Sequence, residues 1–213
     1  MKRMVTGGIL FMALAFAPVS WNGCDAKTNP AQSANEDGAE KLLALAKSYK
    51  STGHSSEALN CYRQAAEHGQ PQAQAWLGAA YYDGLPGVPR DRAVAAKWLR
   101  KAAEHGCAKE VYCLLGCLYE KGEGVPQNFP EAVDWYRKAA EQGDAEAQIR
   151  MGIVLMHGAA GVSQDVAEAY KWFSLAAAHG SKELNRYRVE LLRLMTSEQI
   201  AAGQARATTF VRK

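Results

Sequence analysis

The sequence predicts an all-α fold in which helix–turn–helix units stack one on the next. Four similar segments end in glycine at positions 69, 106, 143 and 180, a constant step of 37 residues. Within each unit, apolar residues recur three and four positions apart, which is the spacing of one helix face. Glycines and helix-capping residues separate these apolar runs at matching places. A fixed period of this size is typical of repeat proteins whose units contact only their neighbours.

Composition supports one continuous core and argues against a nucleic-acid partner. Of 213 residues, 48% are hydrophobic, and the formal net charge is +3. Removing Lys2 and Arg3 from the 25 basic residues leaves 23 against 22 acidic ones. A nucleic-acid-binding surface needs a clustered excess of Lys and Arg, so we expect none here.

Residues 1–26 have the features of an export signal. Lys2 and Arg3 form a basic start, and residues 9–17 form an apolar stretch too short to span a bilayer. We therefore expect an exported bacterial protein, either periplasmic or secreted, or anchored to a membrane by a lipid. An uncleaved N-terminal anchor remains the alternative.

The cleavage point has two interpretations. Cleavage after Ala26 would make Lys27 the first residue of a soluble exported protein. Residues 21–24 instead resemble a bacterial lipoprotein box with an atypical first position, in which Cys24 would be lipidated. Residues 27–37 follow; they are polar and rich in Asn, Ala and Pro without apolar periodicity, which predicts a disordered linker.

Three full units follow a less regular one and occupy residues 70–106, 107–143 and 144–180. In the last of them, two apolar faces are separated by glycines, and Asp165 and Gly180 mark the start and end of the second helix. The first face comprises Ala147, Met151, Gly152 and Leu155, and the second comprises Ala169, Trp172, Phe173 and Ala176.

Equivalent slots in the three units hold equivalent residues. The helix caps are Asp91, Asn128 and Asp165; the small first-helix residues are Gly78, Gly116 and Gly152; the second-helix aromatic residues are Trp98, Trp135 and Trp172. Because glycine inside a helix costs about 1 kcal/mol relative to alanine, a repeated one predicts close helix–helix approach. We expect the tryptophans to be the wedges that pack between helices.

The repeated pattern resembles a known family. Residues 115–125 (LGCLYEKGEGV) and 135–140 (WYRKAA) are similar to the two halves of the Sel1-like repeat, a relative of the tetratricopeptide repeat. The resemblance implies a right-handed α/α superhelical solenoid that scaffolds protein–protein contacts, often in bacterial envelope or secreted proteins.

The two ends depart from the regular repeat. Residues 38–69 resemble a degenerate tetratricopeptide-like unit, with Cys61 in the tryptophan slot. Residues 181–213 are expected to form two capping helices over the open end of the stack. Residues 196–199 (TSEQ) match a capping box, which predicts that the second of these two helices begins there. The first should present one apolar face comprising Leu184, Tyr187, Leu191 and Leu194.

The cysteines leave several possibilities open. Apart from Cys24, four remain: Cys61, Cys107, Cys113 and Cys117. In an oxidising compartment one or two disulfides would form among them, with three possible connectivities; the alternative is free or buried thiols. Neither a metal-ligand spacing nor a catalytic or cofactor-binding motif occurs in the sequence, so we expect no cofactor and no metal.

Binding residues are predicted from the resemblance to tetratricopeptide geometry. It implies that fixed first-helix positions face an inner groove, and these include Lys47, Lys50, Tyr82, Glu120, Ile153 and Met156. The groove would change from cationic to apolar along the array, which suits a peptide or helix with an acidic end. The alternative is a solvated face whose contacts lie elsewhere.

We therefore predict a non-enzymatic scaffold or adaptor that binds a protein or peptide partner. One alternative is an envelope hydrolase acting on β-lactams or peptidoglycan, an activity described for some cysteine-rich relatives. Another is a modulator of a larger complex, tethered through Cys24. The identity of the partner and the oligomeric state do not follow from the sequence.

Overall fold

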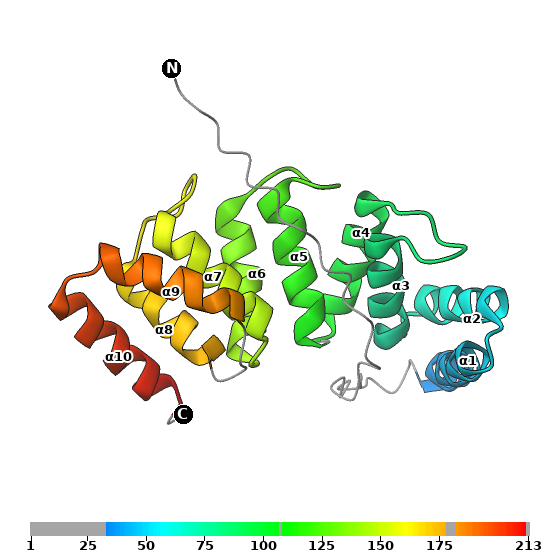
Figure 1. The fold of residues 1–213 in the computed structure, drawn as a ribbon. Helices are drawn as coiled ribbons and strands as arrows, with labels where there is room; N and C mark the ends of the chain where they lie inside the picture. Colours follow the sequence, from blue (N-terminus) through cyan, green and yellow to red (C-terminus); the bar gives the residue numbers. More distant parts are fainter. Residues whose placement is uncertain (1–32, 107, 178–181, 212–213) are drawn as a thin grey trace, which may run out of the picture.

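The computed structural model describes residues 33–106, 108–177 and 182–211. This part of the chain holds ten helices and no named strand, so the all-α prediction is confirmed. They are α1 Ser33–Ser51, α2 Ser55–Glu67, α3 Pro71–Asp83, α4 Arg92–Glu104, α5 Lys109–Lys121, α6 Phe129–Glu141, α7 Ala145–His157, α8 Val166–Ala177, α9 Lys182–Leu194 and α10 Ser197–Val211. The helices follow one another from one end of an elongated array to the other (Figure 1). None of these described helices is long and apolar enough to cross a membrane.

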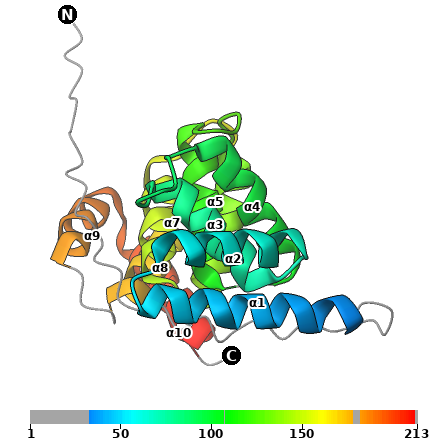
Figure 2. The same ribbon diagram turned by 90° about the vertical axis from the view of Figure 1, so that its right-hand side faces the viewer.

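The boundary between linker and first helix differs from the prediction. Residues 33–37 were expected to be disordered, but they form the start of α1. Figure 2, an end-on view, shows how far α1 extends beyond α2. Residues 1–32, which include the predicted signal and Cys24, lie outside the described residues.

Helix starts and ends follow the predicted capping residues. The carboxylate of Asp91 accepts hydrogen bonds from the amides of Ala93 at 3.0 Å and Val94 at 2.9 Å. The equivalent caps, Asn128 and Asp165, accept from amides three residues ahead. The closing glycines at 69, 106 and 143 have φ of +86°, +70° and +77°, as a left-handed helix end requires. Gly180 lies outside the described residues.

Each unit is held together by a glycine on the first helix that faces a bulky residue on the second. A Cβ built on Gly78 would lie 2.6 Å from Cγ of Leu99. At Gly116 it would lie 2.5 Å from Cδ1 of Tyr136, and at Gly152 it would lie 2.6 Å from Cδ1 of Phe173. The predicted close approach of the two helices is therefore confirmed in all three units.

The side chain that packs against each glycine, however, belongs to the residue after the predicted tryptophan. Leu99, Tyr136 and Phe173 are fully buried against the glycines. Trp98 and Trp135 are only half-buried and carry the ammonium groups of Lys101 and Lys138 over their rings, at 4.7 and 4.1 Å from the ring centroids. Trp172 is the exception, because Phe210 of α10 packs edge-on against it at a centroid distance of 5.5 Å.

First helices line the inner side of the array. α3 contacts α5, and α5 contacts α7, whereas the second helices α4, α6 and α8 approach one another less closely. Elements that are closer together lie on the inside of a curved stack. We define the inner face as the surface formed by α1, α3, α5 and α7.

Successive units are joined where the turn of one unit sits on the second helix of the unit before it. Gly124 lies so close to the start of α4 that an added Cβ would be 2.4 Å from the amide nitrogen of Ala93. Gly161 occupies the same place over Pro130 of α6. At the C-terminal end Gly203 of α10 takes this place. A Cβ added to Gly203 would lie 3.0 Å from the carbonyl oxygen of Ala167. α10 therefore covers the position that a further unit would occupy.

The second C-terminal helix begins at Ser197, within the capping box that the sequence predicts. The capping box of α10 is confirmed: the Thr196 hydroxyl accepts from the Gln199 amide at 3.3 Å, and the Gln199 side chain accepts from the Thr196 amide at 2.9 Å. Leu184 and Leu191 of α9 are buried as expected. Leu194 is 51% exposed, because the helix ends there and its last turn no longer faces the stack.

The joint between units makes a specific prediction for the substitution Gly124→Ala. Its φ of +74° is unfavourable for alanine, and the new Cβ would collide with the backbone of α4. We expect a loss of about 2–5 kcal/mol in the free energy of unfolding, measured by urea denaturation.

Gly87→Ala is the matched control. Gly87 precedes Val88 as Gly124 precedes Val125, and it has a similar φ of +79°, but nothing lies within 4 Å of its added Cβ. It should lose only about 1–2 kcal/mol. Equal losses in the two variants would contradict the assignment of Gly124 to the joint.

Candidate functional site

The two predicted lysines lie exposed on the N-terminal part of the inner face. The Lys47 ammonium donates a hydrogen bond to Gln72 of α3 at 3.1 Å. The Lys50 ammonium lies 5.9 Å from the centroid of the Trp76 ring, which in turn stacks on Tyr62 at 3.9 Å. Both lysines thus bridge α1 and α3 while keeping their charge at the surface.

The other predicted positions are less accessible. Tyr82 exposes only 8% of its surface, because the guanidinium of Arg92 covers its ring at 3.5 Å from the centroid. Ile153 is half-buried. Met156 has no exposed surface, since α9 packs against this end of α7, and it cannot contact a partner in this conformation. Glu120 lies in a polar cluster.

Most residues of this cluster belong to the middle unit. When the three units are aligned on Gly78, Gly116 and Gly152, four middle-unit slots hold thiol, carboxyl or phenol groups. The equivalent residues are Ala75, Cys113 and Ile149; Ala79, Cys117 and Ile153; Tyr82, Glu120 and Met156; and Leu99, Tyr136 and Phe173. The flanking units fill these slots mainly with aliphatic side chains and phenylalanine, so packing alone does not require the polar groups.

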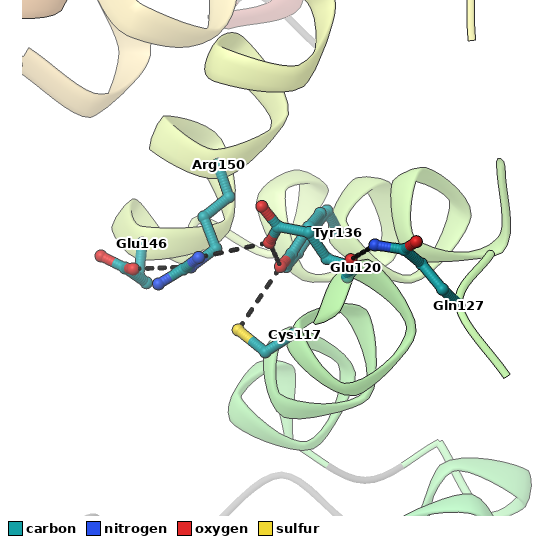
Figure 3. Close-up of polar contacts among 6 residues, drawn as sticks. All are labelled: Cys117, Glu120, Gln127, Tyr136, Glu146 and Arg150. Carbon is teal, nitrogen blue, oxygen red and sulfur yellow. Dashed lines mark hydrogen bonds and ion pairs between the residues drawn. The ribbon is translucent and has the colours of Figure 1, made fainter. Parts of the chain in front are cut away.

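The Tyr136 hydroxyl is at the centre of the cluster (Figure 3). It lies 3.4 Å from Sγ of Cys117 and is hydrogen-bonded to the Glu120 carboxylate. A hydroxyl has one proton to donate, and the charged carboxylate is the stronger acceptor. Burial raises the pKa of Tyr136, which keeps this proton in place at neutral pH.

Arg150 of α7 connects the cluster to the next unit. Its guanidinium donates to Glu120 of α5 at 3.2 Å and to Glu146 on its own helix at 2.8 Å. The Glu120 and Arg150 side chains are 24% and 26% exposed. The cluster therefore opens to solvent on the inner face through this ion pair, with the thiol and the phenol beneath it.

The thiols of this cluster are free. Cys113 and Cys117, and also Cys61 on α2, are free cysteines in the structure, and no disulfide joins any two of these three. Cys107 lies outside the described residues, and pairings that involve it stay a prediction. Among the described residues, no group of His, Cys, Asp or Glu side chains is placed to hold a metal ion.

The two middle-unit thiols are neighbours on α5. The interaction with Cys117, together with burial, raises the pKa of the Cys113 thiol. The Cys113 side chain lowers the pKa of Cys117 to about 7; the Arg150 guanidinium acts in the same direction, while burial opposes both. The cluster therefore places the Cys117 thiol beside a phenol and near a cation.

Sequence reasoning identified Glu120 and the cysteines but missed two members of the cluster. Tyr136 belongs to the repeated second-helix motif, and no repeat position singles out Arg150. One signal was available. The residue that packs against the glycine is tyrosine in the middle unit but leucine and phenylalanine in the flanking units. Nothing in the linear pattern indicates that Arg150 reaches back across a unit boundary.

Comparison with known proteins gives the family. The Sel1 repeat family model matches residues 55–70, 71–107, 110–144 and 145–181, more than half of the chain. The chain belongs to the Sel1 repeat family. The second, third and fourth matched segments coincide with the three units described above to within a few residues. No curated protein matches significantly.

Two solved structures share this fold. A Sel1 repeat protein from Oxalobacter formigenes is 34% identical, with a TM-score of 0.59, over 70% of this chain and 59% of its own. The protein c5321, a protective antigen of uropathogenic Escherichia coli strains, displays an SLR fold and is 25% identical with a TM-score of 0.55, over 86% of this chain and 47% of its own. The chain therefore spans less than two thirds of either relative. Together these findings confirm the helical repeat solenoid.

The bridging role of Arg150 predicts the effect of replacing it with methionine. Arg150→Met leaves Glu120 and Glu146 close together without their shared cation. We expect a loss of about 1–3 kcal/mol in the free energy of unfolding, measured by urea denaturation.

Arg137→Met is the control, because Arg137 makes one exposed ion pair with Asp134 at 3.0 Å on the outer helix α6. It should lose about 0–1 kcal/mol. If Arg150→Met were as mild as this control, Arg150 would not hold α5 and α7 together.

Proposed function

We propose that the protein is a non-enzymatic scaffold of the bacterial envelope that binds a protein or peptide partner along its inner face. Sel1 repeats are protein–protein interaction modules in general, and the family assignment carries that coarse function to this chain. The observation that favours the inner face is the pair Lys47 and Lys50, two exposed cations on one helix beside the partly exposed Trp76.

The chemistry of this surface favours a partner with an acidic segment. Two ammonium groups attract carboxylates, and an aromatic ring supplies apolar contact area. Further along the inner face, Ile153 is half-buried and offers an apolar contact. A peptide or helix with an acidic end and an apolar remainder would match this order of residues.

Location at the envelope is part of the proposal and rests on the sequence of residues 1–26. We expect the mature protein either to begin at Lys27 or to carry an acyl adduct on Cys24. The intact mass of protein recovered from its native envelope distinguishes these two forms. Recovery of the full-length chain from the cytoplasm would contradict export.

The hydrolase alternative has a direct test. Pure protein would turn over a chromogenic β-lactam, and the turnover would be lost when Cys117 or Glu120 is substituted. The inner-face cluster gives no further support to this alternative, because its nucleophile lies beneath the Glu120–Arg150 ion pair.

The scaffold proposal predicts where the partner binds. Photo-crosslinking side chains placed at Lys47 and at Ile153 should capture the same protein in intact cells, and one at Lys97 on α4 should not. With that partner purified, Lys47→Glu combined with Lys50→Glu should raise Kd about tenfold or more, because two attractive charges become repulsive.

The matched control reverses two charges on outer helices, Arg63→Glu and Lys97→Glu. Both residues are exposed, and the net charge change is identical, so a general electrostatic effect would weaken binding equally. Crosslinks obtained only from Lys97, or equal loss of affinity in both double variants, would place the binding surface elsewhere.

A further inference from the structure

The helix α9 occupies the place of the first helix of a fourth full unit. It spans Lys182–Leu194 and α7 spans Ala145–His157, so both of its ends lie one 37-residue period further along the chain. α9 contacts α7 and α8, just as α7 contacts α5 and α6. Its buried side chains, Leu184 and Leu191, stand in slots that are buried on α7 as well. α9 therefore continues the series α3, α5 and α7.

Among the described helices, none pairs with α9 as a second helix. In the unit of α7, residues 158–165 form the turn that lets α8 fold back onto the first helix. Only residues 195–196 separate α9 from α10, and α10 packs on α8 instead. Figure 2 shows α9 and α10 lying apart. One side of α9 is therefore without the cover that every other first helix has.

The face of α9 that a second helix would cover carries exposed apolar side chains. Val189 stands one period after Gly152, in the slot that faces the second helix in the full units, and Leu192 stands one period after Leu155. Val189 is 52% exposed and Leu192 is 43% exposed, whereas Gly152 and Leu155 are buried. We call the surface formed by Val189 and Leu192 the open face of α9.

Positive charge lines one edge of the open face. Arg186 and Arg193 are seven residues apart, so they lie on the same side of the helix, and both are exposed. Arg186, Val189 and Arg193 line an open hollow together with Asn185 and Glu190. The Glu190 carboxylate is already engaged, because it lies 3.9 Å from Nε2 of His157. The charges at this edge therefore favour an acidic occupant.

A second copy of this chain fits the open face less well. Two α9 helices that paired antiparallel through Val189 would place Arg186 of one copy beside Arg193 of the other. Both arginines of each copy would then gather along the same edge of the contact, and like charges placed together oppose binding. A partner with carboxylates along that edge avoids this repulsion.

We propose that the open face of α9 binds an amphipathic helix of a partner protein, which takes the place that a second helix has in the other units. The partner helix carries carboxylates along one edge, opposite Arg186 and Arg193. It has a small residue such as alanine where it contacts Val189, because the valine side chain fills the space that glycine leaves free in the full units. An apolar stripe and flanking charges together select such a helix.

The surface is separate from the one that contains Lys47 and Lys50, so the inference does not rest on the proposed function. It concerns the C-terminal end of the array, and the lysines lie on α1 at the other end. Loss of partner binding at the lysines would leave the open face unaffected. The two proposals can therefore fail separately.

Two synthetic peptides test the charge preference on the full-length chain. Both are about 15 residues long and are held helical by a hydrocarbon cross-link, since free helices of this length are marginal in water. Each has a stripe of alanine and leucine, edged by glutamate in one peptide and by lysine in the other. The glutamate peptide should have a Kd about tenfold lower, measured by fluorescence anisotropy. Arg186→Glu combined with Arg193→Glu should reverse this order, which a purely structural role of the arginines would not do.

Substitutions on the open face test where the peptide binds. Val189→Glu combined with Leu192→Glu should abolish binding of the glutamate peptide. Both side chains are exposed, so the chain should stay folded, and an unchanged urea denaturation midpoint verifies this. Leu45→Glu is the matched control, because Leu45 is 44% exposed on α1. This control should leave the Kd unchanged.

A third peptide tests the size of the contact residue. It has tyrosine in place of the central alanine of the glutamate peptide, and it should bind the native chain several-fold more weakly. Val189→Gly should favour the tyrosine peptide, because it recreates the arrangement in which Gly116 faces Tyr136.

Four results would overturn the proposal. They are no binding of the glutamate peptide at about 1 mM, equal affinity for the glutamate and lysine peptides, binding that survives Val189→Glu with Leu192→Glu, and a dimer that this double variant dissociates. The last result, measured by sedimentation velocity, would mean that a second copy covers the open face.

Discussion

The contact between a first-helix glycine and a bulky second-helix residue sets the geometry of every full unit. Because Gly78, Gly116 and Gly152 have no side chain, the paired helix approaches closely enough to bury Leu99, Tyr136 or Phe173 against its backbone. The two helices of a unit then present fixed outer surfaces to their neighbours. The joint at Gly124, the position of α10 and the curvature that creates the inner face all depend on that spacing.

This constraint explains how the middle unit can carry polar groups without losing the fold. The backbone of each unit is positioned by the glycine and by the helix caps, so the remaining slots can vary in chemistry. Cys117, Glu120 and Tyr136 occupy slots that the flanking units fill with aliphatic side chains, methionine, phenylalanine or, in one case, the phenol of Tyr82, and Arg150 supplies the cation from the next unit. The polar cluster is thus an addition to a frame that the flanking units build without it.

Features that depend on neighbouring positions in the chain were predictable. Period, helix caps, closing glycines and the α10 capping box follow from local residue patterns and are present in the structure. Periodicity could not decide which of two adjacent residues, Trp135 or Tyr136, faces the glycine, since both lie near the apolar face. The burial of Met156 depends on α9, and the contact between Arg150 and Glu120 depends on how two units pack. Neither relation is encoded in local spacing.

The central claim is that the middle-unit cluster serves function and not folding. The most direct test is the stability of one variant, Cys117→Ala with Glu120→Met, Tyr136→Phe and Arg150→Leu, in which each new residue already stands in the same slot of a neighbouring unit. The account predicts a folded protein with a free energy of unfolding equal to or above that of the parent, because buried polar groups are replaced by apolar ones. A loss of several kcal/mol would mean that the cluster holds the array together, and would contradict the claim.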